Sequence, residues 1–133
     1  MNQVCIGDGV TGGATRGVMI IAQTIRYTGA AWEVMTERGM TQQSNITLTW
    51  EGANNRLKID LSGMDNTYAA KPMVMVTAFD DNVAPRQFTP QARCTDADTL
   101  YVKFYDDATA IGPIETSEST GMVFSLLVIG KSL

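Results

Sequence analysis

A hydrophobic period of two constrains the fold of this chain more than any other feature. In the stretch ITLTWEGANNRLKIDL, Ile46, Leu48 and Trp50 alternate with polar residues, and the alternation resumes from Leu57 to Leu61 after Gly-Ala-Asn-Asn. Successive side chains of a strand point to opposite faces, so each run has one apolar face. Two such runs joined by a short polar turn predict a β-hairpin with one buried face.

Similar runs recur along the rest of the chain. Helical spacing is not sustained over any window of eleven residues, and at most a short helical turn is expected around 36–43 or 65–70. Closely spaced strands with turn residues between them are typical of sandwiches and barrels. We therefore expect an all-β fold, an antiparallel β-sandwich with a barrel-like alternative and very little helix. Beyond the hairpin, strands are expected at 18–27, 30–35, 71–80, 99–107 and 121–130.

The length predicts a single domain. A chain of 133 residues, 44% apolar and 18% charged, can bury a core without disulfides or metals. We expect a glycine-rich N-terminal lead over 1–17 and one β-sandwich domain over 18–133. The lead lacks the basic and apolar regions of a secretory signal, and the longest apolar runs are too short for a bilayer-spanning helix.

The lead contains Gly7-Asp8-Gly9-Val10-Thr11-Gly12, which matches the G-x-G-x-x-G spacing of a dinucleotide-binding loop. That loop follows a buried strand and opens a helix. Here the preceding segment is short, and Gly12, Gly13 and Gly17 disfavour a helix after the motif. We interpret the match as a coincidence, expect no cofactor, and expect this lead to dock against a neighbouring subunit.

Charge and composition exclude several functions. The net charge is −4, and the ten Lys and Arg residues are scattered along the sequence, so no nucleic-acid partner is expected. The chain has no histidine, which removes Ser-His-Asp and Cys-His chemistry. We expect a protein that is not an enzyme. Cys5 and Cys94 are expected to remain reduced in a cytosolic setting.

Asp96 and Asp98 form an Asp-x-Asp fragment that could supply oxygen ligands to Ca²⁺. No EF-hand pattern with a closing glutamate accompanies them. Aspartates between strands are also ordinary turn residues. We interpret the pair first as a turn and second as a calcium site.

Two long polar segments, 79–98 and 106–121, are expected to be loops, where recognition often resides on a rigid β scaffold. Asp81, Asn82 and Arg86 are the receptor-binding candidates in the first segment. Trp32, beside a Thr-Gly turn, is a fourth candidate, because an exposed tryptophan can stack on a sugar ring. The alternatives are passive linkage for the loops and core packing for Trp32.

Three segments are apolar at consecutive positions rather than at alternate ones. They are 18–22, 73–76 and 126–129. A strand with one solvated face should alternate, whereas a strand covered on both faces need not. We expect an outer face covered by another subunit, or alternatively a closed barrel with long covering loops.

The order of elements adds a resemblance. The chain runs from a glycine-rich lead through W-E-V, the hairpin with RLKIDL, MVMVTAFDD and LYVKFYDDATAIGP to a closing FSLLVIG. Over residues 18–130 this order resembles the C-terminal tip domains of tailed-bacteriophage tail-fibre proteins. The resemblance implies a β-sandwich that forms a homotrimer and recognises the bacterial surface through distal loops. The repetitive shaft usual in fibre proteins is absent from this sequence.

These observations lead to one functional hypothesis and two alternatives. The hypothesis is a tail-fibre protein of the virion tail, assembled in the host cytoplasm, that binds a bacterial surface polysaccharide or outer-membrane receptor. Its other partners would be virion tail proteins, with no insertion into a membrane. The alternatives are another virion structural protein, at the head surface or the baseplate periphery, and a capsule-depolymerising enzyme fragment.

Overall fold

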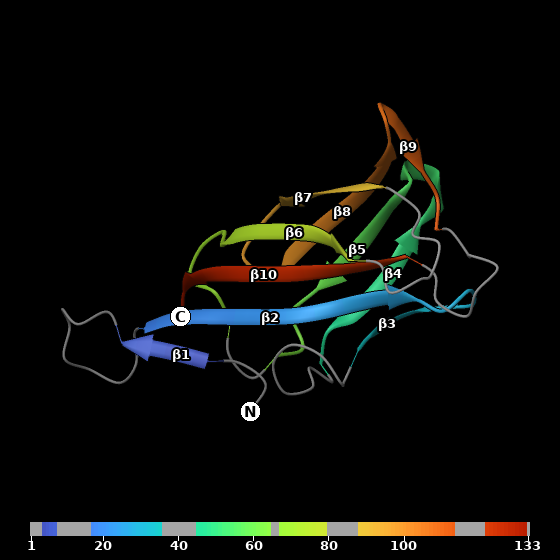
Figure 1. Ribbon diagram of the computed structural model, residues 1–133. Coiled ribbons are helices and arrows are strands. Elements are labelled where there is room, and N and C mark those ends of the chain that lie inside the picture. The colour runs from blue at the N-terminus through green and yellow to red at the C-terminus, as the bar shows by residue number, and fades with distance from the viewer. Residues whose placement is uncertain are drawn as a thin grey trace.

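The computed structural model describes residues 4–7, 17–35, 45–64, 67–79, 88–113 and 122–132, with the backbone alone at 4–7 and at Phe79. Two antiparallel five-stranded sheets face each other, and the strands of the rear sheet cross those of the front sheet obliquely (Figure 1). The expected all-β sandwich is confirmed. Within the described ranges, one short 3-10 turn is the whole of the helical structure, and no helix could cross a membrane.

The front sheet, sheet A, pairs the start of the domain with its end. β2 and β10 run antiparallel from Val18 opposite Lys131 to Arg26 opposite Val123. β6 flanks β10, whereas β1 and β3 pair with opposite ends of β2. The strands are β1 (Val4–Gly7), β2 (Gly17–Tyr27), β3 (Trp32–Val34), β6 (Met73–Phe79) and β10 (Val123–Lys131).

The rear sheet, sheet B, is built around the predicted hairpin. Trp50 pairs with Leu57, and Leu48 pairs with Ile59. The turn is the 3-10 segment η1 (Gly52–Asn54), closed by Asn55 in the left-handed region at φ 46°. The strands follow the order β4 (Thr47–Glu51), β5 (Arg56–Asp60), β8 (Thr99–Asp106) and β7 (Thr89–Cys94), and β9 (Thr109–Ile111) also pairs with β8.

The core lies between the sheets and follows from the alternation. Every second residue of β5 and β8 is fully buried, and β2 and β10 contribute the opposing layer. Aromatic rings join the two layers, since Phe104 of sheet B and Phe124 of sheet A have centroids 5.4 Å apart. The largest fully buried apolar side chains are Phe104, Phe124, Met19, Ile21, Ile25, Leu57, Ile59, Leu100 and Leu126.

The two segments expected to be loops each contain a strand, which corrects that expectation. β7, with sequence TPQARC, lies within 79–98, and β9 lies within 106–121. β7 is the last strand in the path β4-β5-β8-β7, a position where Pro90 is tolerated. Its composition does not predict a strand, and its strand structure comes from pairing with β8. β9 returns along β8 after a turn at Asp107, whose φ is 53°.

The lead contains β1, antiparallel to β2, and β2 itself begins at Gly17, one residue earlier than expected. The strand expected at 30–35 is confined to Trp32–Val34. The segment 36–43, where a helical turn was expected, is outside the described residues. Tyr68, in the other such segment, forms an isolated bridge with Ser132.

Candidate binding surfaces

The outer face of sheet A carries the exposed large apolar side chains of the described residues. The side chains on it alternate with the buried side chains of β2 and β10 and with the core-facing valines of β6. The register places them in two rows across the three strands. These rows, hereafter the apolar face, are Ile20–Ile129–Met73 and Ala22–Leu127–Met75.

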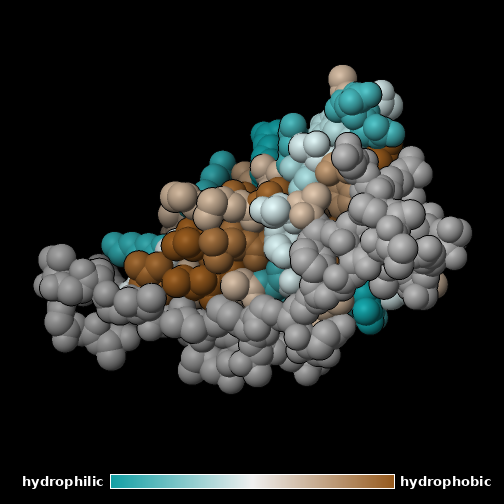
Figure 2. Space-filling model, viewed as in Figure 1, coloured by the Kyte–Doolittle hydropathy of each residue, from teal (hydrophilic) through white to brown (hydrophobic). Residues whose placement is uncertain are grey.

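The apolar face is open to solvent in the isolated chain. Met73 is 67% exposed and Met75 is 49% exposed, the two exposed large apolar side chains of the described part of the chain. Figure 2 shows the patch in brown over β2, β10 and β6. The three consecutively apolar segments of the sequence therefore lie on neighbouring strands. A contiguous patch of this kind typically marks an interaction surface.

The apolar face ends at a polar row. Thr24, Ser125 and Thr77 lie opposite one another on β2, β10 and β6, and the hydroxyls of Thr24 and Ser125 are 3.4 Å apart. A shallow pocket of about 310 Å³ lies at this boundary and includes Met75 and Leu127. The surface therefore combines an apolar area with hydroxyl groups at its margin.

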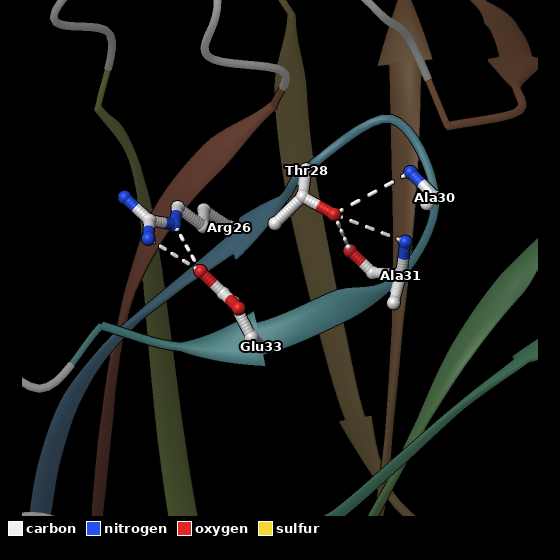
Figure 3. A network of polar contacts seen from close by, with 5 residues as sticks. All are labelled: Arg26, Thr28, Ala30, Ala31 and Glu33. Atoms are coloured by element: carbon white, nitrogen blue, oxygen red, sulfur yellow. Dashed lines mark hydrogen bonds and ion pairs between the residues drawn. The ribbon is translucent and has the colours of Figure 1, made fainter.

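The turn between β2 and β3 positions the aromatic candidate Trp32. The Thr28 hydroxyl accepts hydrogen bonds from the N–H groups of Ala30 and Ala31, at 3.4 and 3.1 Å, and donates to the Ala31 carbonyl (Figure 3). Gly29 has a φ of 95°, which glycine adopts readily. Beyond the turn, an ion pair between Arg26 and Glu33 joins the two strands (Figure 3).

Trp32 packs mainly as an extension of the core. Its ring stacks on Phe104 with centroids 5.4 Å apart and an interplanar angle of 8°, and Trp50 lies 6.1 Å away. Its Nε1 atom is buried, and no described residue accepts a hydrogen bond from it. Tyr27, Trp32 and Trp50 also line a pocket of about 420 Å³. Trp32 thus serves the core, and its contact with a sugar stays a prediction.

Asp96 and Asp98 lie in the turn between β7 and β8. The Asp98 N–H donates to Asp96 Oδ1 at 3.1 Å, and the Thr99 hydroxyl donates to Asp98 Oδ1. The contact between the two carboxyl groups, helped by the Asp98 amide, holds the pKa of Asp96 below its usual value and raises the pKa of Asp98. Among the described side chains, no third acidic or thiol group completes a metal site with them.

The other receptor-binding candidates lie outside the described residues. Asp81, Asn82 and Arg86 belong to the segment between β6 and β7. Most of the G-x-G-x-x-G motif, which continues beyond Gly7 of β1, is also outside the described residues. Cys94 carries a free thiol that donates to the Pro72 carbonyl at 3.3 Å, and burial raises its pKa. The side chain of Cys5 is not described.

Sheet B carries a basic surface that was not predicted from the sequence. The Lys and Arg residues are scattered along the chain, but Arg56, Lys58, Arg93 and Lys103 lie on the outer face of β5, β7 and β8. The available signal was the alternation of RLKID and YVKFY, in which cations and tyrosines occupy the positions opposite the core residues.

Comparison with protein-family models, curated proteins and solved structures found no match for this chain.

Proposed function

We propose that the protein is a non-enzymatic, homotrimeric tail-fibre component of a bacteriophage virion that recognises the host bacterial surface. One observation carries this proposal: the apolar face of sheet A, with Met73 and Met75 largely exposed in the single chain. Soluble monomers rarely expose large contiguous apolar patches, and such patches are typical of subunit interfaces. Burial of this face between copies of the chain would remove it from water.

Two parts of this proposal, the number of subunits and the place in a bacteriophage virion, come from the resemblance to tail-fibre tips. In such an assembly, sheet A faces the neighbouring subunits, and sheet B and the connecting segments face outward. Each subunit then needs only a weak contact with the receptor, because three linked contacts raise the overall avidity without any new interaction. The rigid two-sheet core holds the outward surfaces in fixed positions relative to one another.

The assembly part is tested by the molar mass in solution, measured by light scattering on a sizing column. We expect three times the chain mass of 14.4 kDa, stable to dilution. The double variant Met73→Lys/Met75→Lys should be monomeric, because two ammonium groups would have to be buried in the interface. Thr47→Lys/Thr89→Lys places the same charges at exposed positions of sheet B and should remain trimeric. A monomeric wild type would contradict the assembly.

The recognition part is tested by sedimentation of labelled protein with a panel of bacterial cells. Saturable binding to some strains, lost in the monomeric Met73→Lys/Met75→Lys variant, supports both recognition and avidity. A trimer that binds no cells but binds isolated phage particles would contradict recognition and favour a head-decoration or baseplate-peripheral role.

A further inference from the structure

The outer face of sheet B concentrates positive charge on a protein whose net charge is negative. Arg56, Lys58, Arg93 and Lys103 are four of the ten cationic residues of the chain. One row across the sheet consists of Lys58, Tyr101 and Arg93, which the registers of β5, β8 and β7 place opposite one another. Lys103 follows on the same face of β8, opposite Gln91. This face therefore alternates cations with tyrosines.

Three of these four cations line a pocket of about 340 Å³. Arg56, Arg93 and Lys103 line it together with Gln91, Tyr101 and Tyr105, and none of the described residues that line it is acidic. Two carboxylates of this face already have partners. Glu51 pairs with Arg56 and so offsets one of the cations of the pocket, and Asp60 accepts a hydrogen bond from the Ser62 amide. The volume is at the lower end of the range of small-ligand sites.

Arg56 is fixed in position before any ligand binds. Its Nε and Nη2 atoms both donate to one oxygen of Glu51, at 3.0 and 2.9 Å, and its guanidinium carbon lies 3.7 Å from the centroid of the Tyr101 ring. Nη1 has no acceptor among the described residues. A guanidinium held by a carboxylate and an aromatic ring loses little side-chain entropy on binding.

Arg93 and Lys103 are free to take an anion. Neither has an ion-pair or hydrogen-bond partner within the described part of the chain. Charge-assisted hydrogen bonds from arginine and lysine to a carboxylate or phosphate are among the strongest that a surface can offer. The half-buried Tyr105 adds a flat apolar ring beside them.

We infer that this pocket binds an acidic saccharide, with the cations on its anionic groups and the ring of Tyr105 against a sugar ring. Lys103 and Tyr105 are successive outward residues of β8, which places a cation beside a ring and suits a saccharide that carries an anionic group beside an apolar ring face. Duplex nucleic acid fits less well, because duplex binding depends on many simultaneous phosphate contacts, and this face offers four cations, one of which is paired with Glu51. The inference names the ligand class of the proposed receptor recognition and rests on that proposal for its biological setting.

The test is titration calorimetry of the full chain with tetragalacturonic acid, with maltotetraose as the neutral saccharide of equal length. We expect saturable binding of the acidic saccharide alone, weakened as NaCl rises from about 50 to about 300 mM because salt screens the contact. Arg93→Gln/Lys103→Gln should weaken binding at least roughly tenfold, because two charge-assisted hydrogen bonds are lost. Lys71→Gln/Lys131→Gln makes the same charge change elsewhere and should retain most of the affinity.

Three results would overturn the inference: no saturable binding, an equal loss of affinity in the two double variants, or tighter binding of a duplex oligonucleotide than of the saccharide. The bacterial-cell assay separates this inference from the proposed function. If cells are bound equally by the wild type and by Arg93→Gln/Lys103→Gln, the pocket is not the recognition site, although the proposed function stands. If the saccharide binds in this pocket and no cells are bound, the proposed function fails and the site stands.

Discussion

The ring of Tyr68 lies against the backbone of Gly130, in the space that a side chain at position 130 would occupy. A Cβ atom there would lie 2.7 Å from Cδ1 of Tyr68 and 2.9 Å from Cβ of Pro72. The Tyr68 hydroxyl also donates to the Val128 carbonyl at 3.0 Å. The segment before β6 is thereby fixed against the end of β10, beside the apolar face.

Gly130→Ala should therefore destabilise the protein. Both atoms that the new methyl group would meet belong to buried side chains, so the segment must shift, at a cost of about 1–3 kcal/mol. Urea unfolding followed by tryptophan fluorescence measures the change. Gly112→Ala is the matched control, because a Cβ there meets nothing within 4 Å, and it should change stability by less than about 0.5 kcal/mol. Equal stability of the two variants would refute the close approach.

The two ends of the domain are joined by Ser132. Its hydroxyl accepts a buried hydrogen bond from the Gly17 N–H at 3.0 Å, and its own N–H donates to the Gly17 carbonyl at 2.7 Å. Ser132→Ala leaves the Gly17 N–H without its acceptor, which should cost about 1–3 kcal/mol. In this variant, exchange of the Gly17 amide hydrogen should be faster than in the wild type. Slower exchange there would contradict the hydrogen bond between the Gly17 N–H and the Ser132 hydroxyl.

The hydroxyl of Thr28 organises the turn before Trp32. Thr28→Ala removes the hydrogen bonds with Ala30 and Ala31 and should cost about 1 kcal/mol. Thr28→Ser keeps the hydroxyl and should recover most of that loss in the same thermal-unfolding experiment. If serine and alanine are equally destabilising at this position, the methyl group matters and the hydrogen bonds do not.

Asp60 gives the fold a dependence on acidic pH. Hydrogen bonds from the Ser62 hydroxyl and amide lower the pKa of its carboxyl below the usual 3.8. The contribution of the ionised Asp60 carboxylate to folding stability is therefore complete at pH values above 3.8, the pKa expected in the unfolded chain. It is lost as the pH falls through the lower pKa of the folded state. Ser62→Ala should move the Asp60 pKa, measured by NMR titration, upward. Asp60→Asn should remove this part of the acid-induced loss of stability.

The sequence predicts the parts of the fold in which the core dictates the pattern. The β4–β5 hairpin is found as expected because Leu48, Trp50, Leu57 and Ile59 alternate and their cross-strand pairs face the core. β7 could not be found in this way. Its sequence TPQARC has weak strand propensity, and its strand structure comes from antiparallel pairing with β8, which follows it directly in the chain.

Of the two candidate surfaces, one was indicated by the sequence and the other was not. The three doubly apolar segments indicate an unusual outer face, and strand pairing then places them side by side. The basic surface of sheet B was not anticipated, because Arg56, Arg93 and Lys103 belong to three different strands and meet only through the order β5-β8-β7. A linear search for runs of charge cannot detect residues that a sheet brings together, whereas alternate positions within each strand could have indicated them.

The apolar face also makes stability depend on protein concentration. If copies of the chain bury it, the folded oligomer is favoured over unfolded monomers by mass action, and Tm rises with concentration. Met73→Ser/Met75→Ser should abolish this dependence. It should leave the stability of the single chain almost unchanged, because both side chains are already exposed in it. Scanning calorimetry over about a hundredfold range of concentration measures both quantities. A wild-type Tm that is independent of concentration would show that the apolar face is not buried against another copy.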